Sequence, residues 1–104
     1  MFSRILTMRL KPNHVTDLMK VIDDSVLPLL RKQEGFKDAV FFADASGTEA
    51  VVMSLWDRKE NAETYANKTY PQVLQLLTSL LDGTPHVKAL NVISSTFHKA
   101  AAAV

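Results

Sequence analysis

The chain opens with an alternating pattern of apolar positions. Leu6, Met8 and Leu10 share one parity, which is the two-residue period of a β-strand, so we expect a strand over residues 2–10. Runs rich in valine and phenylalanine at 36–43 and 49–56 flank a polar loop and predict an antiparallel hairpin. Residues 85–97 predict a fourth strand, because the stretch carries Val87, Leu90, Val92, Ile93 and Phe97 among Ser and Thr.

Two other stretches repeat apolar residues at steps of three and four, which predicts amphipathic helices. Pro28 should kink or end the first helix, and Pro71 should break the second near Tyr70, because proline lacks the N–H that a helix interior needs. Gly35 suits the left-handed position that follows a helix. The two stripes are Val15, Leu18, Ile22, Val26 and Leu29, and then Tyr65, Thr69, Val73, Leu76, Leu77 and Leu80.

The order β-α-β-β-α-β predicts an α+β fold of the ferredoxin-like type. This fold has a four-stranded antiparallel sheet with both helices on one face. Both faces of the predicted hairpin are apolar, because Val40 and Phe42 have the opposite parity to Phe41, and Val51, Met53 and Leu55 have the opposite parity to Val52 and Trp56. Neither set can face water without exposing a large apolar patch. We expect a second copy to cover it, sheet against sheet, so that a homodimer forms a dimeric α/β barrel.

Composition narrows the possible functions. The 104 residues contain 12 Lys and Arg against 11 Asp and Glu, a net charge of +1, and no Cys. This length predicts one domain, over residues 1–99, followed by an alanine-rich tail at 100–104 that should fray. A near-neutral charge disfavours nucleic acid as a partner. Arg4 and Arg9 interrupt the apolar N-terminus, so we expect no signal peptide or membrane partner, and a cytoplasmic location.

Two short motifs then point to a family. Gln33-Glu34-Gly35-Phe36 at the exit of the first helix and Leu55-Trp56-Asp57-Arg58-Lys59-Glu60 at the exit of the third strand resemble the antibiotic biosynthesis monooxygenase (ABM) domain family. The likeness covers nearly the whole chain and includes the broken second helix. It implies a dimeric α/β barrel. In characterised members it implies oxygen-dependent chemistry on quinol-type aromatics without metal or flavin, or oxidative haem breakdown.

Site residues of that family match only in part. The polyketide-oxidising members carry an Asn on the third strand where this chain has Val52, and only Trp56 corresponds. The haem-degrading members carry a Trp and an iron-ligating His on the second helix, where this chain has Tyr65 and Gln75. Glutamine is a poor iron ligand, so haem degradation is the least expected of the family's activities.

The residues themselves provide few candidates for a site. Trp56 either closes the core or forms a pocket wall, and Tyr65 and Tyr70 flank a helix bend that could open a cavity. Asn91, predicted in mid-strand, would be a buried amide that needs partners. His86 is a weak candidate for a general base. None of the three histidines has a partner at ligand spacing, so we expect no metal site. The resemblance to the ABM family implies that no cofactor is needed.

Two functions follow from these candidates. The first is a cofactor-independent oxygenase of small aromatic compounds of the quinol or phenol type, with a pocket near Trp56 and Tyr65. Such a protein would desolvate, orient and deprotonate its substrate. The alternative is a non-catalytic dimeric protein that binds a small aromatic molecule or has only a structural role.

Overall fold

The computed structural model describes residues 1–96. The predicted domain end at residue 99 and the alanine-rich tail lie outside these residues. The elements follow the expected order, and their bounds are β1 (Phe2–Arg9), α1 (Val15–Val21), the π-helical turn η1 (Ile22–Val26), α2 (Leu27–Arg31), β2 (Phe36–Ala43), β3 (Glu49–Trp56), α3 (Lys59–Lys68), α4 (Tyr70–Leu77), the 3₁₀ turn η2 (Thr78–Leu80) and β4 (His86–Asn91).

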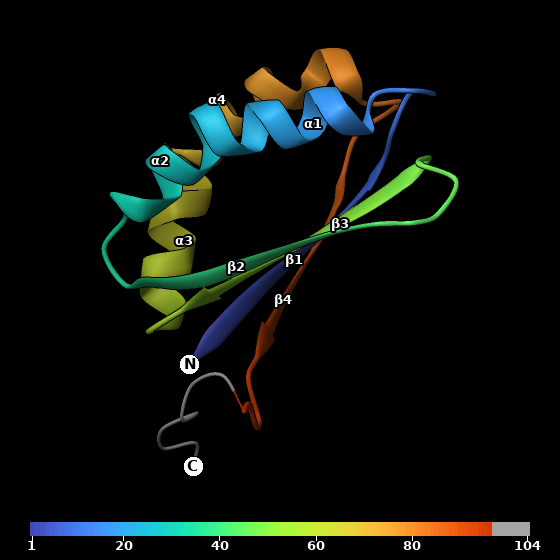
Figure 1. The fold of residues 1–104 in the computed structure, drawn as a ribbon. Helices are drawn as coiled ribbons and strands as arrows, with labels where there is room; N and C mark the ends of the chain where they lie inside the picture. Colours follow the sequence, from blue (N-terminus) through green and yellow to red (C-terminus); the bar gives the residue numbers. More distant parts are fainter. Residues whose placement is uncertain (97–104) are drawn as a thin grey trace.

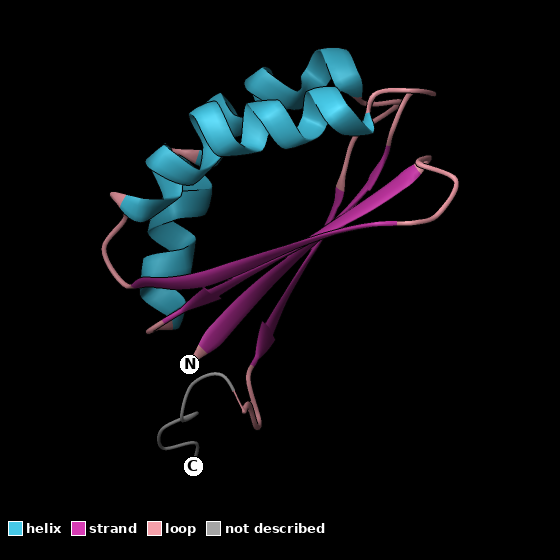
Figure 2. Ribbon diagram, viewed as in Figure 1, coloured by secondary structure: helices cyan, strands magenta, loops and turns pink. Residues whose placement is uncertain are grey.

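The four strands form one antiparallel sheet in the order β2-β3-β1-β4. The helices cover one face of this sheet, and the other face is free of helices (Figures 1 and 2). This is the predicted ferredoxin-like α+β arrangement. The register places Leu6 opposite Val52, and Val52 opposite Phe41, so these three side chains share the face toward the helices. The core lies between this face and the helices.

The two helix prolines, Pro28 and Pro71, interrupt the helices where the sequence predicts. Pro28 stands in the first turn of α2, directly after η1. Proline has no N–H, so Pro28 cannot donate a helical hydrogen bond to the carbonyl of Asp24, four residues earlier. The wider π turn lies where this hydrogen bond is missing. The buried stripe consequently runs through Leu18, Ile22, Val26 and Leu30, so Leu30 takes the place predicted for Leu29. Pro71 lies in the first turn of α4, which begins two residues after α3 ends.

Gly35 connects α2 to β2 with φ of +79°, as predicted. A side chain at this position would collide with Asn61 on α3. Glycine is therefore required here both by the backbone conformation and by the space available.

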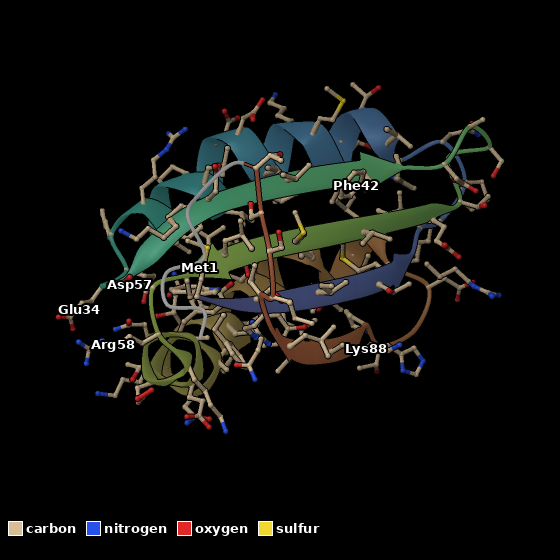
Figure 3. The ribbon with its side chains drawn as sticks, turned by 90° about the horizontal axis from the view of Figure 1, so that it is seen from below. Met1, Glu34, Phe42, Asp57, Arg58 and Lys88 are labelled. Carbon is tan, nitrogen blue, oxygen red and sulfur yellow. The ribbon has the colours of Figure 1, made fainter. Side chains whose placement is uncertain are left out.

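The fourth strand is shorter than predicted and ends at Asn91. The chain then turns back across the helix-free face of the sheet (Figures 1 and 3). The Val92 amide donates to the Met1 carbonyl at 3.0 Å, and Leu55 lies buried beneath this segment. The predicted continuation of the strand to residue 96 is wrong, and residue 97 lies outside the described residues.

Candidate functional site

A cavity lies between the helices and the face of the sheet that they cover. Its interior volume is about 30 Å³, and the space rises to about 470 Å³ when the open mouth is included. The interior has room for about two waters. A ring-sized ligand therefore enters only when lining side chains move. The lining consists of Arg4, Leu6, Met8, Leu18, Ile22, Val26, Leu30, Phe41, Val52, Ser54, Tyr65, Tyr70, Val73 and Leu77.

The polar groups of this lining gather at one end. Arg4, Leu6 and Met8 follow one another along the same face of β1, and a strand rises about 3.4 Å per residue. Arg4 therefore lies roughly 13 Å from Met8 along the strand. Ser54 is the direct neighbour of Arg4 on β3. The cavity thus has an apolar end and a polar end.

Arg4 is the only charged residue of the lining. Its side chain comes from a central strand, and the residue is only 8% exposed. Within residues 1–96 its guanidinium has no ion pair and no hydrogen bond to a side chain or carbonyl. Burial lowers the pKa of Arg4 below its usual value, and Tyr65 and Tyr70 partly oppose this effect. An arginine keeps its proton under such conditions, so the cavity contains an unpaired positive charge.

Two tyrosines flank this charge at the bend between α3 and α4. The guanidinium carbon of Arg4 lies 4.6 Å from the ring centroid of Tyr70 and 5.3 Å from that of Tyr65, which are cation–π distances. Burial raises the pKa of the Tyr65 phenol to about 12 despite the nearby positive charge of Arg4. Burial also raises the pKa of Tyr70. Both hydroxyls are therefore neutral near pH 7.

Trp56 lies one layer behind the cavity. It is fully buried, and its ring packs against Tyr65 at 5.0 Å and Phe36 at 5.5 Å between centroids. Its indole N–H donates to the Ser54 hydroxyl at 3.0 Å, and Ser54 donates to the Arg4 carbonyl at 3.5 Å. Of the two sequence-based readings, the structure favours the core. Trp56 supports Tyr65 and does not line the cavity.

The structure does not bring Asn91 or His86 to the cavity. Asn91 is the last residue of β4 and is exposed, so the prediction of a buried mid-strand amide is wrong. β4 is an edge strand, and all of its residues are exposed. His86 is opposite Thr7 on the face away from the helices, in a surface depression with Glu49 and Asp82. Of the four predicted pocket residues, Tyr65 and Tyr70 line the cavity.

The sequence reasoning missed Arg4. Its signal was nevertheless present, because Arg4 has the same parity as Leu6 and Met8 on the first strand. A charged residue in the buried register of a strand needs a partner, a route to solvent or a ligand. As an interruption of the apolar N-terminus alone, Arg4 gives no indication of the site.

The lining contains no imidazole, carboxylate or thiol, and no group of three or more metal-ligating side chains occurs within residues 1–96. Arginine has only donors, and the Ser54 hydrogen is already used. The polar end therefore provides hydrogen-bond donors and a positive charge. Such an arrangement binds and stabilises a negatively charged oxygen and has no group that would readily accept a proton.

Comparison with known proteins places this geometry in context. No protein-family model and no curated protein matches the chain. Among solved structures, a monooxygenase from Streptomyces coelicolor, in complex with the ligand Nanaomycin D, superposes with a TM-score of 0.73 at 22% identity, over 86% of this chain and 84% of that one. The fold is that of the antibiotic biosynthesis monooxygenases.

Two further structures with this monooxygenase fold agree. A proposed antibiotic biosynthesis monooxygenase from Bordetella bronchiseptica has a TM-score of 0.74 at 12% identity, covering 88% of this chain and 96% of that one. A third, from Deinococcus radiodurans, has a TM-score of 0.71 at 17% identity, covering 88% and 92%. At such identities the likeness establishes the fold, while the chemistry depends on the cavity's own side chains.

In the residues that the structure describes, no helix is both long and apolar enough to cross a membrane. Gln75, which stands where the resemblance to haem-degrading members would require a His, is exposed on α4 and does not line the cavity.

Proposed function

We propose that the protein is a cofactor-independent oxygenase of small aromatic compounds of the phenol or quinol type. The observation that carries the proposal is the cavity with an apolar end for a ring and a polar end, at Arg4, Tyr65 and Tyr70, for its oxygen. The fold shared with a monooxygenase that holds an organic ligand supports the same class of function.

The reaction needs no outside reductant. A phenol in which the ring carbon para to the hydroxyl carries hydrogen reacts with O₂ to give a quinone and water. One oxygen atom becomes the new carbonyl, and the other leaves as water with the ring hydrogen and the hydroxyl hydrogen. The ring loses four electrons and O₂ gains four. The protein contributes a dry, oriented site in which the electron-rich anion meets oxygen.

A non-catalytic binding protein is the second candidate, and one observation favours it. No residue of the cavity lining is an obvious proton acceptor. A protein that only sequesters a small aromatic molecule needs the cavity and no base.

Oxygen uptake separates these two candidates. The purified protein is titrated with simple phenols and hydroxynaphthoquinols, and binding is followed by the fluorescence of Trp56, the only tryptophan. The oxygenase should consume one O₂ per phenol and place one labelled oxygen atom in the quinone when the O₂ is isotopically labelled. Saturable binding without oxygen consumption would establish the binding protein instead.

Tyr65→Phe sharpens this test. The variant keeps the ring that packs on Trp56 and removes only the hydroxyl. If that hydroxyl stabilises charge that develops only while the bound anion reacts with O₂, oxygen uptake should fall about tenfold or more while ligand affinity changes little. Equal losses of affinity and uptake would count against a catalytic contribution.

We also propose that the protein is a homodimer, as the sequence analysis predicted. We call the sheet surface away from the helices the open face, defined by Ile5, Val40, Phe42, Val51 and Met53 (Figure 3). Phe42 is 51% exposed on this face. An apolar sheet surface of this kind favours association with a second copy, sheet to sheet.

A further inference from the structure

We propose that the cavity takes its aromatic ligand as the oxyanion, with the Arg4 guanidinium as the group that selects the ionised form. This inference rests on the proposed function, and it names the ionisation state of the substrate and the residue that recognises it.

Burial of the Arg4 charge costs free energy. Arg4 is 92% removed from solvent, lies among apolar side chains and has no ion pair or side-chain hydrogen bond within residues 1–96. A buried cation without a partner is destabilising. The two tyrosine rings provide cation–π contact, which recovers only part of that cost. The arrangement becomes fully paired when a negative charge enters.

The side chains that share the cavity with Arg4 come from all the elements packed around it. Tyr65 comes from α3, Tyr70 from α4 and Ser54 from β3, and α1, η1, α2 and β2 contribute only apolar side chains. No acidic side chain lines the cavity. The positive charge is therefore available to a ligand, and no internal carboxylate competes for it.

A phenol that binds as its anion must give up its hydroxyl proton. Because the lining has no carboxylate or imidazole, a phenol bound in its neutral form would have no good acceptor for its proton. A guanidinium beside the phenol oxygen favours the anion and lowers the pKa of the bound phenol. The proton is then released to water as the ligand binds, so Arg4 takes over the role of the missing base. Arg4 is a binding residue in this scheme.

The test uses a matched pair of ligands. 4-Nitrophenol ionises to a phenolate with its own visible band, and 4-nitroanisole has the same ring but cannot ionise. Both are titrated into the intact protein over a range of pH, and binding is followed by Trp56 fluorescence and by the phenolate band. Bound 4-nitrophenol should titrate at least about one pH unit below the free phenol, which is a tenfold preference for the anion.

Arg4→Met should abolish this change in titration and weaken 4-nitrophenolate binding about tenfold to a hundredfold, as expected for a lost charge-assisted hydrogen bond. The affinity for 4-nitroanisole should stay within about twofold. Arg4→Gln provides a second neutral variant if Arg4→Met does not fold. Arg9→Met removes an exposed arginine from the same strand and should leave both ligands unaffected.

Two results would overturn the inference. One is that bound and free 4-nitrophenol titrate together in the wild-type protein, which requires no variant. The other is that folded Arg4→Met or Arg4→Gln keeps the preference for the anion. Oxygen uptake is measured separately: anion binding without oxygen consumption would overturn only the proposed oxygenase, and turnover without a preference for the anion would overturn only this inference.

Discussion

The guanidinium carbon of Arg4 lies 4.6 Å above the ring centroid of Tyr70. Arg4 belongs to β1, one of the two central strands of the sheet, and Tyr70 is the first residue of α4, directly before Pro71. The contact therefore joins the sheet to the bent helix pair at the polar end of the cavity. It holds a positive charge in a place where hydrophobic packing alone would have placed an aliphatic side chain.

Arg4→Met should therefore stabilise the free protein. Methionine fills similar space without a charge to desolvate, and the removed burial cost exceeds the lost cation–π contacts. We expect the free energy of unfolding to rise by about 1 to 2 kcal/mol, measured by chemical denaturation near pH 7. Arg9→Met, on the exposed end of the same strand, should change it by less than about 0.5 kcal/mol. A loss of stability in Arg4→Met would show that Arg4 is a structural residue.

Tyr65 should make stability fall at high pH. Burial raises its pKa from an ordinary value of 10.0 to about 12 in the folded state. The contribution of the neutral phenol is thus complete below pH 10 and is lost as the pH rises toward 12, because only the unfolded chain loses this proton readily in that range. The loss attributable to Tyr65 amounts to up to about 3 kcal/mol.

Denaturation of wild type and Tyr65→Phe at a series of pH values measures this contribution. The unfolding free energy of the wild type should fall by that amount relative to that of Tyr65→Phe as the pH rises. Lysine titration affects both proteins alike. A difference that stays constant with pH would mean that the Tyr65 phenol is accessible to water in the folded state.

The fold could be predicted from the sequence because the local hydrophobic patterns agree with the packing of the elements in the tertiary structure. Strand parity, helical stripes and the two prolines all pointed to the same element order. The π turn at Ile22–Val26 could not be predicted, because a helix widens there in response to Pro28, and the apolar spacing of four residues fits both forms. The exposure of Asn91 depends on the edge position of β4, which a single strand's pattern does not encode.

The site was harder to predict from the sequence than the fold, because its residues come from elements that are distant in the chain. The two tyrosines could be named because a helix bend is visible as Pro71. Arg4 was missed because arginine in a strand is normally read as solvent-facing, although its parity with Leu6 placed it inside. A cavity arises from elements distant in sequence, so its charged residue can be recognised only when strand parity is applied to polar residues as strictly as to apolar ones.

Ser54→Ala should destabilise the protein although it removes one small hydroxyl. Ser54 accepts the indole N–H of Trp56 at 3.0 Å, and both residues are buried. Without the hydroxyl, the indole N–H is left unsatisfied, which costs about 1 to 3 kcal/mol. Ser94→Ala, at an exposed position, is the control. Thermal and chemical unfolding measure both. Stability unchanged within about 0.3 kcal/mol would indicate that another acceptor replaces Ser54.

Met53→Lys should convert the proposed homodimer into a monomer. Met53 lies on β3, paired with Ile5 and Val40 across the open face. A lysine there would place two like charges in an apolar interface, one from each copy, at a cost of several kcal/mol. Met19→Lys is the matched control, because Met19 is 59% exposed on the helix side. Native mass spectrometry and light scattering should show a dimer for wild type and Met19→Lys and a monomer for Met53→Lys. A monomeric wild type would contradict the proposal outright, since the open face would then remain in water without a second copy.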